Sequence, residues 1–322
     1  PEGRKFMDRL GAAIKRSSTP ADLAARARQA VDLCAASGTT AMRAQCDVDS
    51  ILQLDGVRAL LKIRDELRHL IDLQVVVFPA GGNILDEPDL LNLVERAMEL
   101  GADGVGGIPE IDPDRAADYL DLVFKVARDH GGVVDVHVDQ PKDQRLFSFP
   151  IMLEKARQYG LEGKVTGAHA NSLAMQPRER VVEVLKDMAV TGVHLACLPY
   201  GLIEERIQLP KSLGVNVSLI NDNVRDPWQR GGSGDLIQMA MIYARTGAVR
   251  TDAELEEAFD MLTYDGARAL GLADYGIRPG ARADLVLFDA AAAPDVICQH
   301  VRPAMVFKNG RVTAQDGRMR PR

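Results

Sequence analysis

The chain is short of the features that predict binding to nucleic acids or membranes. Aromatic residues make up only 5% of its 322 residues, too few to predict a surface on which nucleic-acid bases stack. It carries a formal net charge of −7 and no dense run of lysine and arginine, so no nucleic-acid partner is expected. Its apolar runs stay shorter than the roughly 18 residues that a membrane helix needs, so we expect no membrane association.

Cysteine is also scarce. The four cysteines, Cys34, Cys46, Cys197 and Cys298, lie far apart and form no Cys-x-x-Cys pair. This spacing argues against a zinc ribbon and a disulfide framework, and it predicts a reducing, cytoplasmic location. The chain begins with Pro-Glu-Gly and passes directly into helix-like sequence over 4–15, so we expect further residues upstream of Pro1.

What the sequence does contain is a regular alternation of strand-like and helix-like segments. Runs such as Val-Val-Val-Phe over 75–78 show no polar alternation, as expected for strands that are buried on both faces. The predicted strands are 39–46, 72–79, 103–109, 132–138, 164–170, 193–199 and 215–222. The predicted helices among them are 21–37, 55–70, 88–100, 113–130, 148–160 and 176–191.

Repeated strand–helix units of this kind predict an α/β fold with a parallel sheet, and we interpret it as a (β/α)8 TIM-like barrel. A closed barrel needs eight strands and seven are predicted, so we place its first strand upstream of Pro1. The alternative is a doubly wound open sheet. It is disfavoured because no glycine-rich phosphate fingerprint opens the first strand–helix turn.

The pattern changes after Gly231. Helices are predicted over 234–247, 252–262 and 264–271, and strands over 283–289, 296–301 and 304–312. Asn309-Gly310 is the signal of a tight hairpin within the last segment. We therefore divide the chain into a barrel domain, 1–275, and a small β-rich appendage of β-sandwich type, 276–322.

Three polar residues stand at the ends of predicted strands, where a barrel of this class builds its active site. His137, His169 and Asp222 end the fourth, fifth and seventh predicted strands. Imidazole and carboxylate groups together are typical ligands of catalytic zinc or iron. Small residues on both sides of His169 are expected to leave room for a ligand. For His137, which shares a strand face with Asp135 and Asp139, the alternative is an internal hydrogen-bonded network that supports the strand.

Other polar and aromatic residues that follow strand ends are weaker candidates for the site. Glu110, Asn223 and Trp228 are candidates for substrate binding, and Asp226-Pro227-Trp228 is expected to form a rigid turn. Gln45 and Asp47 end the first predicted strand and are weaker candidates. His194 begins a strand, so we expect a structural role for it, and we place His69, His130 and His300 on the surface.

The chain resembles the amidohydrolase superfamily, and within it the cytosine deaminase-like branch. The resemblance rests on segments spread over most of the length: DLQVVVFP (72–79), GADGVGGIPE (101–110), VDVHVD (134–139), GKVTGAHANSLA (163–174), NDNVRDPW (221–228) and GARALGLADYGIRPGARADLVLFD (266–289). It implies hydrolysis of a C–N bond in a small cyclic amine or amide, with bound Zn²⁺ or Fe²⁺ activating water.

The resemblance also assigns roles to individual residues. His137 and Asp222 match family metal ligands, and Asp222 also matches the general base. His169 matches a histidine that orients the hydroxide or the substrate. Gln140 stands where cytosine deaminases carry a glutamate; an amide can orient a substrate but cannot shuttle a proton.

One part of the family pattern has no counterpart in the chain, namely the His-x-His pair that ends the family's first strand. Two hypotheses follow. Either the pair lies upstream of Pro1 and the protein is a metal-dependent hydrolase, or the protein is a metal-free, degenerate member that binds a small molecule without hydrolysing it. A third interpretation is a phosphate-binding barrel that uses Gly231-Gly232-Ser233-Gly234. A homo-oligomer is left open.

Overall fold

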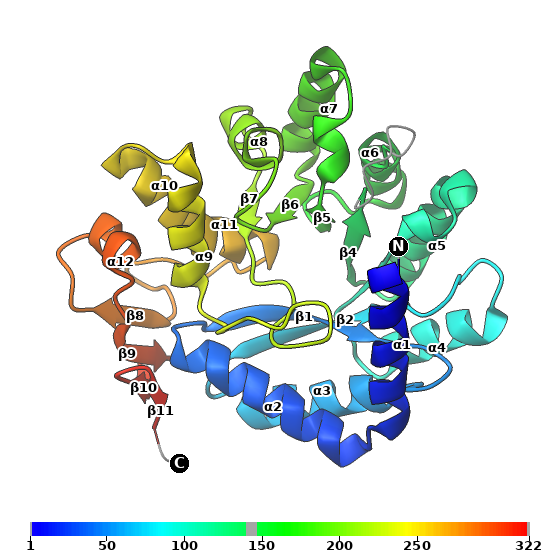
Figure 1. Ribbon diagram of the computed structural model, residues 1–322, viewed down its shortest axis with the longest axis horizontal. Helices are drawn as coiled ribbons and strands as arrows, with labels where there is room; N and C mark the ends of the chain where they lie inside the picture. Colours follow the sequence, from blue (N-terminus) through cyan, green and yellow to red (C-terminus); the bar gives the residue numbers. More distant parts are fainter. Residues whose placement is uncertain (1, 140–146, 321–322) are drawn as a thin grey trace.

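The computed structural model describes residues 2–139 and 147–320 of the chain. Seven parallel strands form one curled sheet, a half-barrel, in the order β1 to β7 (Figure 1). They are β1 (Ala41–Asp47), β2 (Asp72–Phe78), β3 (Gly104–Gly107), β4 (Val133–Val138), β5 (Val165–His169), β6 (His194–Cys197) and β7 (Val217–Leu219). A strand order that never reverses excludes the doubly wound alternative. The predicted TIM-like α/β fold is confirmed, and β1 and β7 do not pair within the described residues.

The helices that connect the strands lie on the outer side of this sheet (Figure 1). The α-helices of the described residues are α1 (Glu2–Ser17), α2 (Pro20–Ala36), α3 (Asp55–Leu67), α4 (Pro88–Glu99), α5 (Ala116–Asp129), α6 (Phe149–Tyr159), α7 (Arg178–Thr191), α8 (Leu209–Ser212), α9 (Leu236–Tyr243), α10 (Asp252–Leu262), α11 (Tyr264–Ala269) and α12 (Ala293–Gln299). Of the helices that the structure describes, none combines the length and apolar character needed to cross a membrane.

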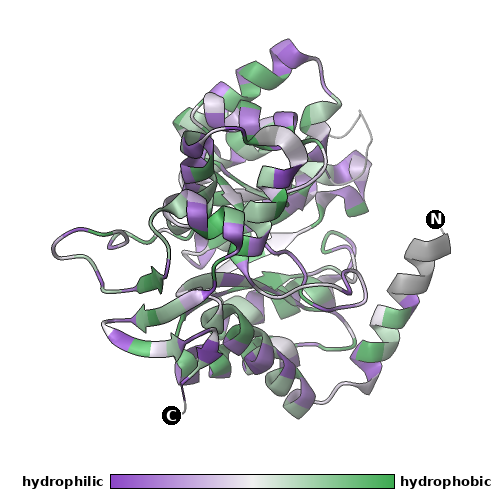
Figure 2. Ribbon diagram, turned by 60° about the vertical axis from the view of Figure 1, so that its left-hand side comes forward, coloured by the Kyte–Doolittle hydropathy of each residue, from purple (hydrophilic) through white to green (hydrophobic). Residues whose placement is uncertain are grey.

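Helix α5 shows why these segments are helical. Tyr119, Leu120, Val123 and Phe124 recur at helical spacing, are fully buried, and pack against β3 and β4. Each such apolar side chain stabilises the fold by about 1.5–3 kcal/mol relative to exposure. Figure 2 shows the resulting pattern, with largely green strands and helices on which green and purple residues alternate. The predicted helix 113–130 begins later, because 3-10 turns occupy Pro109–Ile111 and Pro113–Arg115.

Helix α2 begins and ends as its sequence predicts. The Thr19 hydroxyl accepts a hydrogen bond from the backbone of Asp22 at 3.2 Å, and the Asp22 carboxylate accepts one from the backbone of Thr19 at 3.0 Å. Pro20 occupies the first turn, where a missing N–H costs nothing. Gly38 follows the helix with a φ of 104°, a left-handed conformation that glycine adopts without strain.

The C-terminal residues form a separate four-stranded antiparallel sheet in the order β11-β10-β9-β8. Its strands are β8 (Leu285–Phe288), β9 (Pro303–Lys308), β10 (Arg311–Gln315) and β11 (Arg318–Met319). The predicted hairpin is confirmed, since Asn309 and Gly310 have φ of 50° and 74° and join β9 to β10. The domain boundary at 275/276 stays a prediction.

The predicted strand 296–301 is wrong, because most of this segment lies in α12. Pro294 favours the first helical turn, and the helix buries Val296 and Ile297 where it packs against α9 and α10. A short apolar run does not distinguish a strand from a helix, which explains the error.

A buried lysine joins the small sheet to the half-barrel. Lys308 of β9 is only 1% exposed. Its Nζ lies 2.6 Å from Oδ2 of Asp284, 2.8 Å from Oδ2 of Asp72 and 3.1 Å from the carbonyl oxygen of Thr40. The contact ties β9 to the amino ends of β1 and β2.

Candidate functional site

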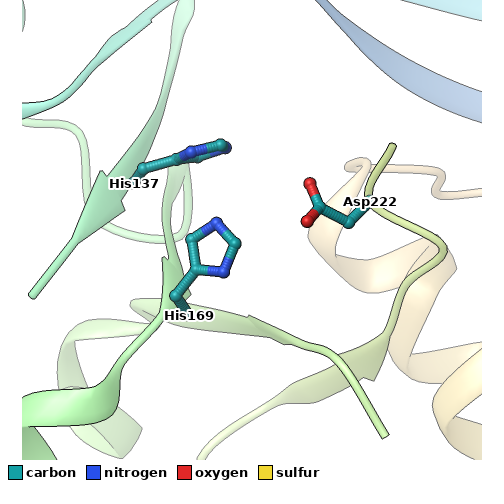
Figure 3. Close-up of side chains that lie close together, drawn as sticks. All are labelled: His137, His169 and Asp222. Atoms are coloured by element: carbon teal, nitrogen blue, oxygen red, sulfur yellow. The ribbon is translucent and has the colours of Figure 1, made fainter. Parts of the chain in front are cut away.

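The three predicted strand-end residues meet at one edge of the half-barrel. His137 lies near the end of β4, His169 is the last residue of β5, and Asp222 follows β7. The carboxyl ends of parallel strands share one edge of the sheet, and one ligand atom from each residue lies within 4.8 Å of the other two. Figure 3 shows the His137 ring edge-on above the His169 ring, with the Asp222 carboxylate facing them.

The backbone at these strand ends is held in an unusual conformation. His169, Ala170 and Asp222 have φ of 73°, 56° and 57°, in the left-handed region that non-glycine residues rarely adopt. Such conformations cost of order 1–3 kcal/mol each and cluster at functional sites, where the surrounding structure maintains them. The turns redirect the chain immediately after the sheet, which is where the three side chains converge.

The two histidines are packed against each other in a largely apolar environment. Their ring centroids are 4.5 Å apart at 82°, and the Phe78 ring centroid lies 4.7 Å from that of His137. Burial lowers the pKa of His137 to about 3, and the neighbouring His169 contributes. Burial, with a contribution from Arg206, lowers the pKa of His169 to about 4. Both imidazoles are therefore neutral at pH 7, the form that binds metal.

These residues fit a divalent cation. Nε2 of His169 is buried and has no hydrogen-bond partner anywhere in 2–139 or 147–320. Leaving a buried polar atom unsatisfied is costly, and a metal bond to that lone pair would remove the cost. Two neutral imidazoles and one carboxylate are also a donor set that zinc and iron accept.

Asp222 has the properties of a proton acceptor. Burial raises the pKa of its carboxyl group, the nearby charge of Asp226 raises it further, and a hydrogen bond from the backbone of Asn223 acts in the opposite direction. A carboxylate with a raised pKa is a stronger base than one in water. Asp226 itself belongs to the predicted rigid turn: its carboxylate accepts a hydrogen bond from the backbone of Gln229 at 2.7 Å.

A second buried carboxylate, close to the site, is engaged in hydrogen bonds with neighbouring residues. Asp139 is 0% exposed, and it accepts hydrogen bonds from the Ser148 hydroxyl at 2.8 Å and from the Ser172 hydroxyl. Its backbone N–H donates to Glu110. Glu110, predicted to bind substrate, thus has a contact that fixes the turn after β4. Gln140 follows this turn and lies outside the described residues.

Asp135 belongs to an internal network rather than to the strand-end cluster. Oδ2 accepts a hydrogen bond from Nη1 of Arg43 at 2.8 Å, and Oδ1 accepts one from Gln45 at 2.9 Å. Both donors come from β1, so the network ties β1 to β4 inside the half-barrel. The supporting role considered for polar residues of this strand therefore applies to Asp135. Asp47, the other candidate on β1, pairs with Lys15 at 2.7 Å.

The glycine before His169 serves packing rather than ligand access. A Cβ at Gly167 would lie 2.9 Å from Cε1 of Phe149 and 3.0 Å from Cγ2 of Val138. The small residue thus lets α6 approach β5 closely, which differs from the expectation that it leaves room for a ligand. His194 behaves as expected: it is 4% exposed, with Nε2 3.2 Å from the carbonyl oxygen of Gly163.

Of the loop residues predicted to bind substrate, Trp228 is 52% exposed and follows β7, as Asn223 does. The phosphate-binding interpretation does not fit the structure. Helix α9, which follows Gly231–Gly234, is already capped by Asp235, whose carboxylate accepts from the backbone of Ile237 at 2.8 Å. A negative charge at this helix end disfavours a second anion.

Two residues near the site were not anticipated from the sequence. Arg206 is 5% exposed and lies in a π-helical turn, Glu204–Gln208, which gives no sequence signal. Tyr200 is 46% exposed and follows β6. Its position directly after the predicted buried strand 193–199 is the signal that could have identified it.

Comparison with known proteins agrees with this geometry. The sequence profile of the group described as "Amidohydrolase family" matches residues 2–314, and the chain belongs to this family. Within it the chain falls in the cytosine deaminase-like branch, as its sequence motifs predict. Enzymes of this branch act on C–N bonds other than peptide bonds.

Three relatives illustrate what the chain is similar to in sequence and structure. It is 31% identical to the N-isopropylammelide isopropyl amidohydrolase of Pseudomonas sp. (strain ADP) over 87% of this chain and 70% of the relative. It is 26% identical to the pterin deaminase of Rhizobium rhizogenes over 91% of this chain and 70% of that protein. The crystal structure of 5-methylcytosine deaminase from Klebsiella pneumoniae with phosphonocytosine superimposes with a TM-score of 0.90 at 27% identity, covering 100% of this chain and 81% of that one.

Proposed function

We propose that this protein is a metal-dependent hydrolase that cleaves a C–N bond in a small cyclic amine or amide. The observation that carries the proposal is the convergence of His137, His169 and Asp222 within 4.8 Å at the carboxyl edge of the half-barrel. The relatives support the reaction class, because they include an amidohydrolase and two deaminases of cyclic compounds.

In this proposal His137 and Asp222 hold the cation. His169, whose Nε2 is buried, lies close enough either to bind the cation as well or to orient the hydroxide or the substrate beside it. A divalent zinc or iron ion at this place would supply Lewis-acid chemistry that lowers the pKa of water toward ~7. Asp222 is the general base that takes the proton of the attacking water, a role suited to a carboxylate that faces the two histidines at the cation site.

The remaining predicted site residues contact the substrate. Trp228 provides an exposed aromatic face for a planar ring, and Asn223 after β7 and Glu110 after β3 supply polar contacts. Gln140 is proposed to orient the substrate through its amide. The cytoplasmic location is a separate proposal, which the four free cysteines support.

The second candidate function is a metal-free member that binds a small molecule without hydrolysing it. It is favoured by one observation, that the chain contains no His-x-His pair to complete the ligand set. Metal analysis of the full-length protein separates the two, since the first requires about one bound divalent ion per protein and turnover that a chelator abolishes. Metal-free protein without turnover would support the second.

The test of the proposed base is Asp222→Asn in the metal-loaded protein. We expect turnover, measured as release of ammonia or amine, to fall by at least about 100-fold, because an amide cannot accept the proton. Asp65→Asn is the control, because it makes the same change at a 76% exposed side chain on α3, away from the strand ends that carry the site. Activity of Asp222→Asn within a few-fold of the parent would remove Asp222 from the mechanism.

A further inference from the structure

Tyr200 leaves the sheet between the elements that carry the site. The strand order places β6 between β5, which ends at His169, and β7, which precedes Asp222. Tyr200 follows β6 by three residues. Because the carboxyl ends of neighbouring parallel strands share one edge, Tyr200 emerges at the same edge as the two site residues.

The backbone at Tyr200 is fixed although its ring is exposed. Arg206 donates from Nη2 to the carbonyl oxygen of Leu198 at 3.0 Å and to that of Tyr200 at 3.4 Å, and from Nη1 to Oδ1 of Asn171 at 2.8 Å. Arg206 is 5% exposed, so this clamp between the ends of β5 and β6 is buried. The Tyr200 side chain nevertheless remains 46% exposed, an arrangement that suits contact with a ligand better than packing.

The Tyr200 hydroxyl is available as a hydrogen-bond donor. Among the described residues, no group forms a hydrogen bond with this hydroxyl. Partial burial raises its pKa and the charge of Asp222 raises it further, so the hydroxyl stays protonated at neutral pH. The same edge of the sheet therefore offers a carboxylate acceptor and a phenolic donor on neighbouring strand ends.

We propose that Tyr200 is a further substrate-binding residue, whose ring contacts a planar heterocycle and whose hydroxyl donates to an acceptor on it, a carbonyl oxygen or a ring nitrogen. The inference rests on the proposed function and narrows the substrate class to planar rings with an acceptor. Cyclic amines without an acceptor, or with a puckered ring, are poor partners for this residue.

The experiment measures binding separately from turnover. The full-length protein, stripped of metal so that it cannot turn the compounds over, is titrated by calorimetry with 5-fluorocytosine and with N-isopropylammelide, using the parent, Tyr200→Phe and Tyr200→Ala. Loss of one neutral hydrogen bond is expected to raise Kd by about two- to tenfold in Tyr200→Phe. Loss of the ring contact is expected to raise it by about tenfold more in Tyr200→Ala.

Tyr264→Phe is the matched control. Tyr264 is also 46% exposed, but it lies on α11, next to Asp265, whose carbonyl oxygen accepts from Asn216 at 3.0 Å near the start of β7. This is the opposite end of the sheet from the site, so Kd is expected to stay unchanged. Thermal unfolding of each variant verifies that the fold is retained.

The outcomes of this experiment are distinct from those of the proposed function. Unchanged Kd in both Tyr200 variants, or no binding of either heterocycle by the parent, overturns the inference about Tyr200 and its substrate class. If binding depends on Tyr200 but the protein has no metal-dependent turnover, the result supports the inference about Tyr200 and contradicts the proposed hydrolase function.

Discussion

Two histidines of the half-barrel show how position along a strand decides what an imidazole does. Each keeps one buried ring nitrogen without a partner among the described residues, but His169 ends β5, whereas His194 begins β6 and places Nε2 close to the carbonyl oxygen of Gly163. The carboxyl ends of barrel strands face the active site and the amino ends face the stabilising side. The first histidine is thus placed for chemistry and the second for packing.

The structural histidine predicts a pH dependence of stability. Burial lowers the pKa of His194 below 6.5, so the folded protein binds this proton less readily than the unfolded chain. The stabilisation is complete above about pH 6.5 and is lost as the pH falls below it, by at most about 1.4 kcal/mol per pH unit. We expect His194→Gln, whose amide can still donate to Gly163, to flatten the pH dependence of the free energy of unfolding between pH 7 and 5.

Urea unfolding of metal-stripped protein measures this effect. His69→Gln is the control, because His69 is exposed and its replacement should leave the slope unchanged. An identical slope in His194→Gln and the parent would contradict the assignment of a buried, neutral imidazole.

At the scale of the elements, the site depends on how the ends of β5 and β6 are joined. Arg206 carries a buried guanidinium, pairs with no carboxylate in the part of the chain that the structure describes, and donates to three oxygens from both strand ends. The planar guanidinium of an arginine can donate hydrogen bonds to several acceptors that lie in different directions. The ammonium group of a lysine cannot reach the same acceptors with the same geometry.

We predict that Arg206→Lys lowers the free energy of unfolding by about 2–4 kcal/mol, because it leaves buried acceptors unsatisfied. Arg178→Lys is the control. Its pair with Glu204 is 3.1 Å long and both side chains are more than 60% exposed, so its loss should change stability by less than about 0.5 kcal/mol. Urea unfolding at pH 7 compares the two, and equal stability of Arg206→Lys and the parent would show that the clamp is not required.

At the scale of the whole molecule, one buried cation links the two sheets. Lys308 of the small sheet lies between the carboxylates of Asp284 and Asp72, and Asp72 begins β2 of the half-barrel. Arg282 adds a second contact to Asp72 at 2.6 Å. The position of the C-terminal sheet against the barrel is therefore set by charge pairing as well as by apolar contact.

Replacing this cation should destabilise the whole protein. Lys308→Met is expected to lower the free energy of unfolding by about 3–5 kcal/mol, because the buried Asp284 loses its buried counter-ion and keeps only the partly exposed Arg282, at 3.3 Å. Lys62→Met, at a 74% exposed lysine, should change it by less than about 0.5 kcal/mol. A drop below about 1 kcal/mol in thermal or urea unfolding of Lys308→Met would contradict this role.

Much of the molecule follows from local sequence. The capped helix α2, the Asn309-Gly310 hairpin and the seven buried strands are all predictable, because each depends on residues close together in the chain. Segment 296–301 was not, since its helical form depends on packing against α9 and α10. Strand-end polar residues identified His137, His169 and Asp222, but not Tyr200 and Arg206.

The alternating α/β pattern, the family and the three residues that converge at the strand ends can all be identified from the sequence, because each depends on a short stretch of neighbouring residues. Which polar residues are free to act depends on how the chain packs. The tertiary structure placed Asp135 and Asp139 in hydrogen-bonded networks, left Nε2 of His169 without a partner among the described residues, and exposed Tyr200 above a buried clamp. The physical reason is that burial and hydrogen-bond partners come from residues remote in the chain, such as Arg43 for Asp135, which no local pattern specifies.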